Sequence, residues 1–87
     1  MIRLLSMKTI TVKAFGITRD MLGAREKVIE ISDESTVRQL RSTLEQQYPR
    51  LKELKSLFIA INNEYATDEK MLNEHDEIAL IPPVSGG

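Results

Sequence analysis

The 87-residue sequence contains no cysteine, which excludes disulfide bonds, thiolate metal clusters and a cysteine nucleophile. Neither sign of charge dominates, because 12 basic residues are balanced by 13 acidic ones and the net charge is −1. A surface so balanced argues against nucleic acid or a membrane as the main partner. No apolar run approaches the roughly 20 residues that a membrane-spanning helix requires. We therefore expect one small cytoplasmic domain.

Metal-ligating residues are also scarce. The only histidine, His75, lies in the polar segment NEHDE. A single histidine flanked by acids does not provide the set of ligands that a structural or catalytic metal needs. We expect no metal site and read this segment as a solvated turn.

Five segments show the composition or alternation of β-strands. They are residues 9–15, 25–31, 57–61, a short one that starts at 65–66, and 77–81. The segment ITRDMLG between the first two predicts a helical turn that ends at Gly23 in a left-handed conformation. This connection favours an antiparallel pair. Asn62 and Asn63 predict a tight hairpin turn, since asparagine tolerates positive φ.

The segment STVRQLRSTLEQQYP predicts the one long helix. Thr36 is a suitable N-cap, and Gln39 three residues later completes a capping box. Pro49 ends the helix, because the residue before proline avoids the helical region. Apolar residues at spacings of three and four predict a buried stripe on this helix, formed by Val37, Leu40, Leu44 and Tyr48. Apolar residues of other segments are also expected in the core: Met21, Leu51, Leu54, Met71 and Leu72.

The order of elements, two strands, a helix and three strands, predicts an α+β chain. One main helix packed on one face of a mixed sheet is the β-grasp, or ubiquitin-like, arrangement. We expect the domain to span residues 8–81, after a poorly ordered extension at 1–7 and before a flexible tail at 82–87. Either Met1 or Met7 can serve as the start of translation.

The strands at 57–61 and 77–81 are apolar on both faces, as if both faces were buried. One helix covers only one face of a small sheet, so the other face should present apolar side chains. We predict a protein-docking surface there, built from Phe15, Phe58, Ala60, Tyr65 and Ile81. The alternative is that the loop at 67–77 or the N-terminal extension covers this face.

The sequence ends in IPPVSGG, and two of its four glycines are the last two residues. Pro82 and Pro83 stiffen the base of this tail. The bare backbone of Gly86 and Gly87 fits a narrow channel. A free carboxylate on Gly87 reacts only after activation, most simply as an acyl-adenylate. The chain has no phosphate-binding glycine loop, so a separate enzyme must bind the ATP. The tail thus comprises Pro82, Pro83, Val84, Ser85, Gly86 and the reactive Gly87.

Segments along residues 8–87 resemble the small subunit of molybdopterin synthase, a ubiquitin-like sulfur carrier. The tail IPPVSGG is similar to that family's C-terminus, and ITVKAFGITRDMLG is similar to its first strand and the turn that ends in glycine. STVRQLRSTL resembles its helix start, and LFIAINNEYA and DEIALIPPVSGG resemble its last three strands in order and spacing.

The resemblance implies a small subunit of a sulfurtransferase without a complete active site of its own. Gly87 would be adenylated by an enzyme of the ubiquitin-activating type, using ATP, and converted to a thiocarboxylate. The carrier would dock on a larger catalytic subunit in a heterotetramer, thread its tail into that subunit and donate sulfur to a pterin precursor, forming the molybdopterin dithiolene. The family places apolar docking side chains at the positions of Phe15, Tyr65 and Ile81. No cofactor is expected on this chain.

Three other functions remain open at this point. A carrier for thiamin thiazole synthesis has a related design, although the diproline before the glycines disfavours it. A protein modifier joined to lysines by isopeptide bonds would use the same activated Gly87. A β-grasp binding domain with an idle tail would need no reactive end at all.

Overall fold

Alternating apolar residues build the first strand of the sheet. In the computed structural model, which describes residues 6–83, β1 (Met7–Ala14) turns Ile10, Val12 and Ala14 inward, and all three are buried. β2 (Glu26–Ser32) pairs with β1 in antiparallel register and buries Ile29 and Ile31. The two strands therefore supply one half of the sheet's inner face.

The connection between β1 and β2 is a single short helix, as the sequence predicts. α1 (Ile17–Leu22) ends at Gly23, which adopts the left-handed conformation with φ of 75°. The amide of Gly23 donates a hydrogen bond of 2.8 Å to the carbonyl of Arg19, which closes the last turn. This cap turns the chain back so that β2 can run antiparallel to β1.

The main helix begins and ends where the sequence predicts. α2 (Val37–Gln47) is capped by Thr36, whose side chain accepts from the amide of Gln39 while the amide of Thr36 donates to Oε1 of Gln39 at 2.7 Å. Pro49 opens a short 3₁₀ helix, η1 (Pro49–Glu53), directly after it. The stripe on α2 faces the sheet: Val37, Leu40 and Leu44 are buried, and Tyr48 is half-buried against them.

Two of the last three strands form a tight hairpin. β3 (Phe58–Ile61) turns into β4 (Glu64–Tyr65) at Asn62 and Asn63, which adopt φ of 53° and 71°. Positive φ at two consecutive residues is the geometry of a type I′ hairpin turn. β5 (Glu77–Ile81) then pairs with β3 in antiparallel register.

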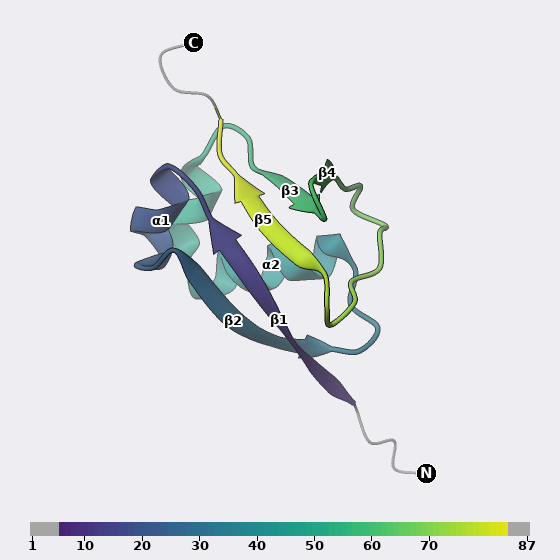
Figure 1. The fold of residues 1–87 in the computed structure, drawn as a ribbon. Helices are drawn as coiled ribbons and strands as arrows, with labels where there is room; N and C mark the ends of the chain where they lie inside the picture. The colour runs from purple at the N-terminus through teal and green to yellow at the C-terminus, as the bar shows by residue number, and fades with distance from the viewer. Residues whose placement is uncertain (1–5, 84–87) are drawn as a thin grey trace.

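The sheet is mixed, and its last strand lies in the middle. The order is β2-β1-β5-β3-β4, with β5 parallel to β1 (Figure 1). α2 crosses behind the sheet, and the core fills the space between them. The predicted β-grasp arrangement is confirmed: one helix covers one face of a five-stranded sheet.

Two details differ from the sequence-based expectations. Met71 is 46% exposed, so its assignment to the core was wrong, while the adjacent Leu72 is 1% exposed. An isolated antiparallel β-bridge joins Met71 to Thr36 and keeps the backbone here extended. Successive side chains of an extended backbone point in opposite directions, so Met71 faces solvent while Leu72 faces the core. The sheet begins at Met7, one residue before the expected boundary at 8. Residues 1–5 and 84–87 lie outside the described residues.

Candidate functional site

The outer face of the sheet carries the predicted apolar surface. The alternation of β3 and β5 that buries Ile59 and Leu80 under α2 turns their neighbours outward. In the pairing of the strands, Phe58 lies opposite Ile81, and Ala60 lies opposite both Ala79 and Tyr65. The predicted set Phe58, Ala60, Tyr65 and Ile81 thus lies side by side on three strands, and we call these residues with Phe15 the docking patch. Ala60 is only 7% exposed, so it lies beneath the larger side chains of the patch.

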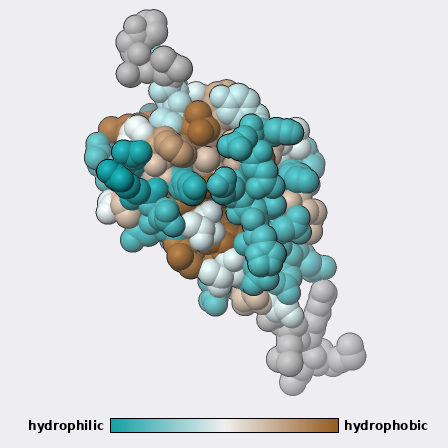
Figure 2. Space-filling model, viewed as in Figure 1, coloured by the Kyte–Doolittle hydropathy of each residue, from teal (hydrophilic) through white to brown (hydrophobic). Residues whose placement is uncertain are grey.

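Three aromatic rings of the docking patch are open to solvent. Phe58 is 50% exposed and Tyr65 is 70% exposed, and their ring centroids lie 5.2 Å apart at a tilt of 34°. Phe15 follows β1 and is 41% exposed. Figure 2, which views this face, shows hydrophobic surface near the end of β5 among hydrophilic side chains. Within residues 6–83, neither the loop at 67–77 nor any helix shields these rings, so the alternative that the loop covers this face fails.

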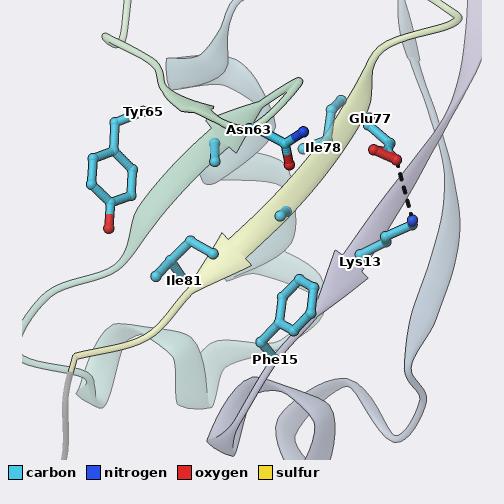
Figure 3. Close-up of a pocket in the computed structure, with 9 residues that line it drawn as sticks. Lys13, Phe15, Asn63, Tyr65, Glu77, Ile78 and Ile81 are labelled. Carbon is cyan, nitrogen blue, oxygen red and sulfur yellow. Dashed lines mark hydrogen bonds and ion pairs between the residues drawn. The ribbon is translucent and has the colours of Figure 1, made fainter.

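A shallow depression of about 350 Å³ lies within this face (Figure 3). Phe15, Ala60, Tyr65 and Ile81 line it together with three polar residues that the sequence analysis missed. These are Lys13, Asn63 and Glu77, and Nζ of Lys13 lies 3.4 Å from Oε2 of Glu77. Lys13 and Glu77 occupy outward positions of β1 and β5, two residues before Phe15 and two before Ala79, and Asn63 lies in the turn between β3 and β4. The site therefore combines an apolar floor with a polar border.

Hydrogen bonds hold the corner between β1 and α1, where Phe15 stands. The buried hydroxyl of Thr18 accepts from the amide of Phe15 at 2.8 Å and donates to its carbonyl at 2.5 Å. Nε of Arg19 donates to the carbonyl of Ala14 at 3.2 Å, and the guanidinium lies 5.9 Å from the centroid of the Phe15 ring. The position of Phe15 is thus fixed from both sides.

The base of the tail lies beside this corner. Ile81 ends β5, and Pro82 and Pro83 follow it half-buried. A Cβ atom on Gly16, whose φ is 56°, would stand 3.2 Å from Cγ of Pro82. The chain therefore leaves the sheet next to Phe15 and the docking patch. The predicted tail residues Val84, Ser85 and Gly86 and the predicted reactive Gly87 lie outside the described residues.

Residues 6–83 contain neither a metal-binding cluster nor a membrane-spanning helix. No group of three or more histidine, aspartate or glutamate residues there is placed to hold a metal ion. No helix in this part of the chain has the length and apolar character to cross a membrane. His75 is exposed in the turn before β5 and does not line the depression.

Comparison with known proteins identifies relatives along the whole chain. The model of the ThiS family matches residues 12–87. The molybdopterin synthase sulfur carrier subunit of Caenorhabditis elegans is 37% identical over 84 residues, which cover 93% of this chain and 100% of that protein. The protein of the same name from Arabidopsis thaliana is 34% identical over 79 residues, covering 90% of this chain and 82% of that protein.

Solved structures share the fold. A putative molybdopterin converting factor, subunit 1, from Pyrococcus furiosus superposes with a TM-score of 0.81 at 26% identity, covering 88% of this chain and 99% of that one. SAMP1 from Haloferax volcanii gives a TM-score of 0.78 at 25% identity, covering 91% and 99%. A complex of subunits 1 and 2 of molybdopterin-converting factor from Helicobacter pylori contains a chain with a TM-score of 0.64 at 25% identity, again covering 91% and 99%.

The β-grasp sheet, its open apolar face and these matches lead to the same assignment. The chain belongs to the ThiS family, together with the molybdopterin synthase sulfur carrier subunits.

Proposed function

We propose that this chain carries sulfur to a larger catalytic subunit of molybdopterin synthase, as a thiocarboxylate on Gly87. One observation carries the proposal: the docking patch is continuous with the base of the tail. Ile81 belongs to the patch and precedes Pro82 directly, so a protein that covers the patch receives the tail at the same time. The folded body then serves to grip partners and to aim the tail.

The chemistry of the tail follows from the low reactivity of a carboxylate. The Gly87 carboxylate attacks the α-phosphorus of ATP, and pyrophosphate leaves as the acyl-adenylate forms. A sulfide equivalent then attacks the acyl carbon, AMP leaves, and a thiocarboxylate remains. In the larger subunit the thiocarboxylate sulfur attacks a carbon of the pterin precursor, the carbon–oxygen bond at that carbon breaks, and the oxygen substituent leaves. Water cleaves the acyl–sulfur bond and restores the carboxylate, and a second carrier supplies the second sulfur of the dithiolene.

Two partners are required, because the sequence has no phosphate-binding glycine loop to hold ATP, and the pterin precursor binds to the larger subunit. An adenylyltransferase of the ubiquitin-activating type performs the activation in the cytoplasm. The larger catalytic subunit receives the charged carrier in a heterotetramer. The complex of subunits 1 and 2 from H. pylori supports this second partnership. Both partners would contact the docking patch of Phe15, Phe58, Ala60, Tyr65 and Ile81, and the tail residues Pro82, Pro83, Val84, Ser85 and Gly86 would enter their active sites.

Intact-mass spectrometry tests the reaction. The purified chain is incubated with ATP, a cognate activating enzyme and a sulfide source, and its mass should rise by the difference between a sulfur atom and an oxygen atom. A matched variant without Gly87 should unfold at the same temperature but gain no mass on incubation, because the last strand of the sheet ends at Ile81. No mass increase in the full-length chain, with an enzyme that charges a known carrier, would refute the proposal.

A protein modifier is the second candidate. The similarity to SAMP1, the small archaeal modifier protein 1, favours it. A modifier would transfer the activated Gly87 to lysine amines rather than to sulfide. Immunoblots of the native cell would then show a ladder of conjugates that disappears when Gly87 is deleted. Thiocarboxylate without such a ladder would leave sulfur transfer as the function.

A further inference from the structure

Arg19 stands at the edge of the docking patch in a fixed position. Its Nε donates to the carbonyl of Ala14 at 3.2 Å, and its guanidinium lies 5.9 Å from the centre of the Phe15 ring. Most exposed arginines sample many rotamers, and binding must restrict them. Here two contacts already restrict the side chain, so little further entropy is lost when its terminal nitrogens meet a partner.

The charge of Arg19 has no acidic partner within residues 6–83. Three other basic residues do have one, whereas Lys8 and Lys27 of the sheet, like Arg19, pair with no acidic side chain in this part of the chain. Lys13 pairs with Glu77, and Arg38 and Arg41 both pair with Asp68. Arg19 is therefore an immobilised cation whose two terminal nitrogens remain available for a carboxylate.

Covering Phe15 changes the surroundings of this charge. A partner that removes the Phe15 ring from water also removes water from the guanidinium beside it. An uncompensated charge in such an environment is strongly unfavourable, whereas a carboxylate held by the guanidinium forms a charge-assisted hydrogen bond. A protein that buries both the Phe15 ring and this guanidinium therefore binds more tightly when it supplies an acidic group at this edge.

We propose that Arg19 is a specificity-determining residue of the docking surface, which receives a carboxylate from the larger catalytic subunit. The inference rests on the proposed function, because it names one contact within that interface. We assign the carboxylate to the larger subunit because the similar chain from H. pylori was solved in complex with its subunit 2.

Calorimetric titration of the larger subunit with the full-length chain tests this assignment. Arg19→Gln should weaken binding by about tenfold to a hundredfold, because it leaves the partner's carboxylate buried without a cation. Arg19→Lys should recover part of the loss, since lysine restores the charge but not the fork of donors. The control is Arg50→Gln, which removes the same charge from the exposed surface of η1, beside α2, and should bind as the unaltered chain does.

Salt dependence separates the ion pair from a loss of packing on Phe15. The affinity of the unaltered chain should fall with ionic strength more steeply than that of Arg19→Gln. Equal losses at every ionic strength would overturn the inference, and so would equal affinities of Arg19→Gln and Arg50→Gln. A loss seen only toward the activating enzyme would overturn the assignment to the larger subunit. If the unaltered chain itself fails to bind that subunit, the proposed function is what fails.

Discussion

Gly23 shows how much a single residue contributes when its backbone conformation is unusual. It ends α1 with φ of 75° and ψ of 18°, a region that residues with a Cβ atom avoid. Space is not the constraint, because no heavy atom lies within 4 Å of the position that a Cβ would occupy. Gly23→Ala therefore isolates backbone strain, and we expect the free energy of unfolding to fall by about 1 kcal/mol.

Urea unfolding measures this effect, with Gly23→Asn as the matched comparison. Asparagine enters the left-handed region more readily than alanine, so its loss should be the smaller of the two. If the alanine variant is as stable as the unaltered chain, the left-handed cap does not determine how α1 ends.

At the scale of the element, the hairpin between β3 and β4 distinguishes two asparagines that look alike in the sequence. Both adopt positive φ, but only the side chain of Asn62 is engaged. Its Oδ1 accepts from the amide of Glu77 at 2.9 Å, and its Nδ2 donates to Asp76 at 3.0 Å. Asn62 thus ties the turn to the start of β5, while Asn63 lies on the border of the depression.

We expect Asn62→Gly to lower the free energy of unfolding by about 1–2 kcal/mol, because two hydrogen bonds are lost. Asn63→Gly should change it by less than about 0.5 kcal/mol, because glycine also suits the second position of a type I′ turn. Denaturant unfolding of both variants measures the difference. Equal losses would show that positive φ, and not the side chain of Asn62, determines the stability of this turn.

Elements with local signals were predictable from the sequence, and elements without them were not. Thr36, Gln39 and Pro49 mark the ends of α2 by interactions within a few residues, so its bounds agree closely with the structure. The loop at 67–77 has no periodicity from which to infer orientation. Its core residue, Leu72, was predicted together with its exposed neighbour Met71, because only contacts with the distant Ser35 and Thr36 settle which side chain points inward.

The candidate site was likewise predictable only in part. Alternation along each strand was enough to place the docking patch on the outer face. The depression was not predictable, because Lys13, Asn63 and Glu77 come together only when three segments are placed side by side. That placement depends on the parallel pairing of β1 with β5, which joins residues more than 60 positions apart.

At the scale of the whole molecule, the two faces of the sheet have separate tasks. The inner face packs against α2 and holds the fold together, and the outer face is open to a partner. Adjacent residues of β5 belong to different faces: Leu80 is fully buried under the helix, and Ile81 lines the depression. Truncating the side chain of Leu80 should therefore affect mainly stability, and truncating that of Ile81 should affect mainly binding.

Leu80→Ala should lower the free energy of unfolding by about 2–5 kcal/mol, as expected for a cavity in a closed core. Ile81→Ala should lower it by less, because that side chain is only partly buried, but should weaken binding to the larger subunit. Guanidinium unfolding and calorimetric titration measure the two quantities. Equal losses of stability at the two positions would contradict the division of tasks between the faces.

The central position of β5 also constrains biosynthesis. β5, which separates β1 from β3, is the last of the five strands to be synthesised, so the sheet closes only after the other four have been made. A message cut short before β5 yields two strand pairs with nothing between them, and such a product is a substrate for proteases. Termination before β5 therefore cannot produce a folded decoy that occupies partners without bearing the reactive end.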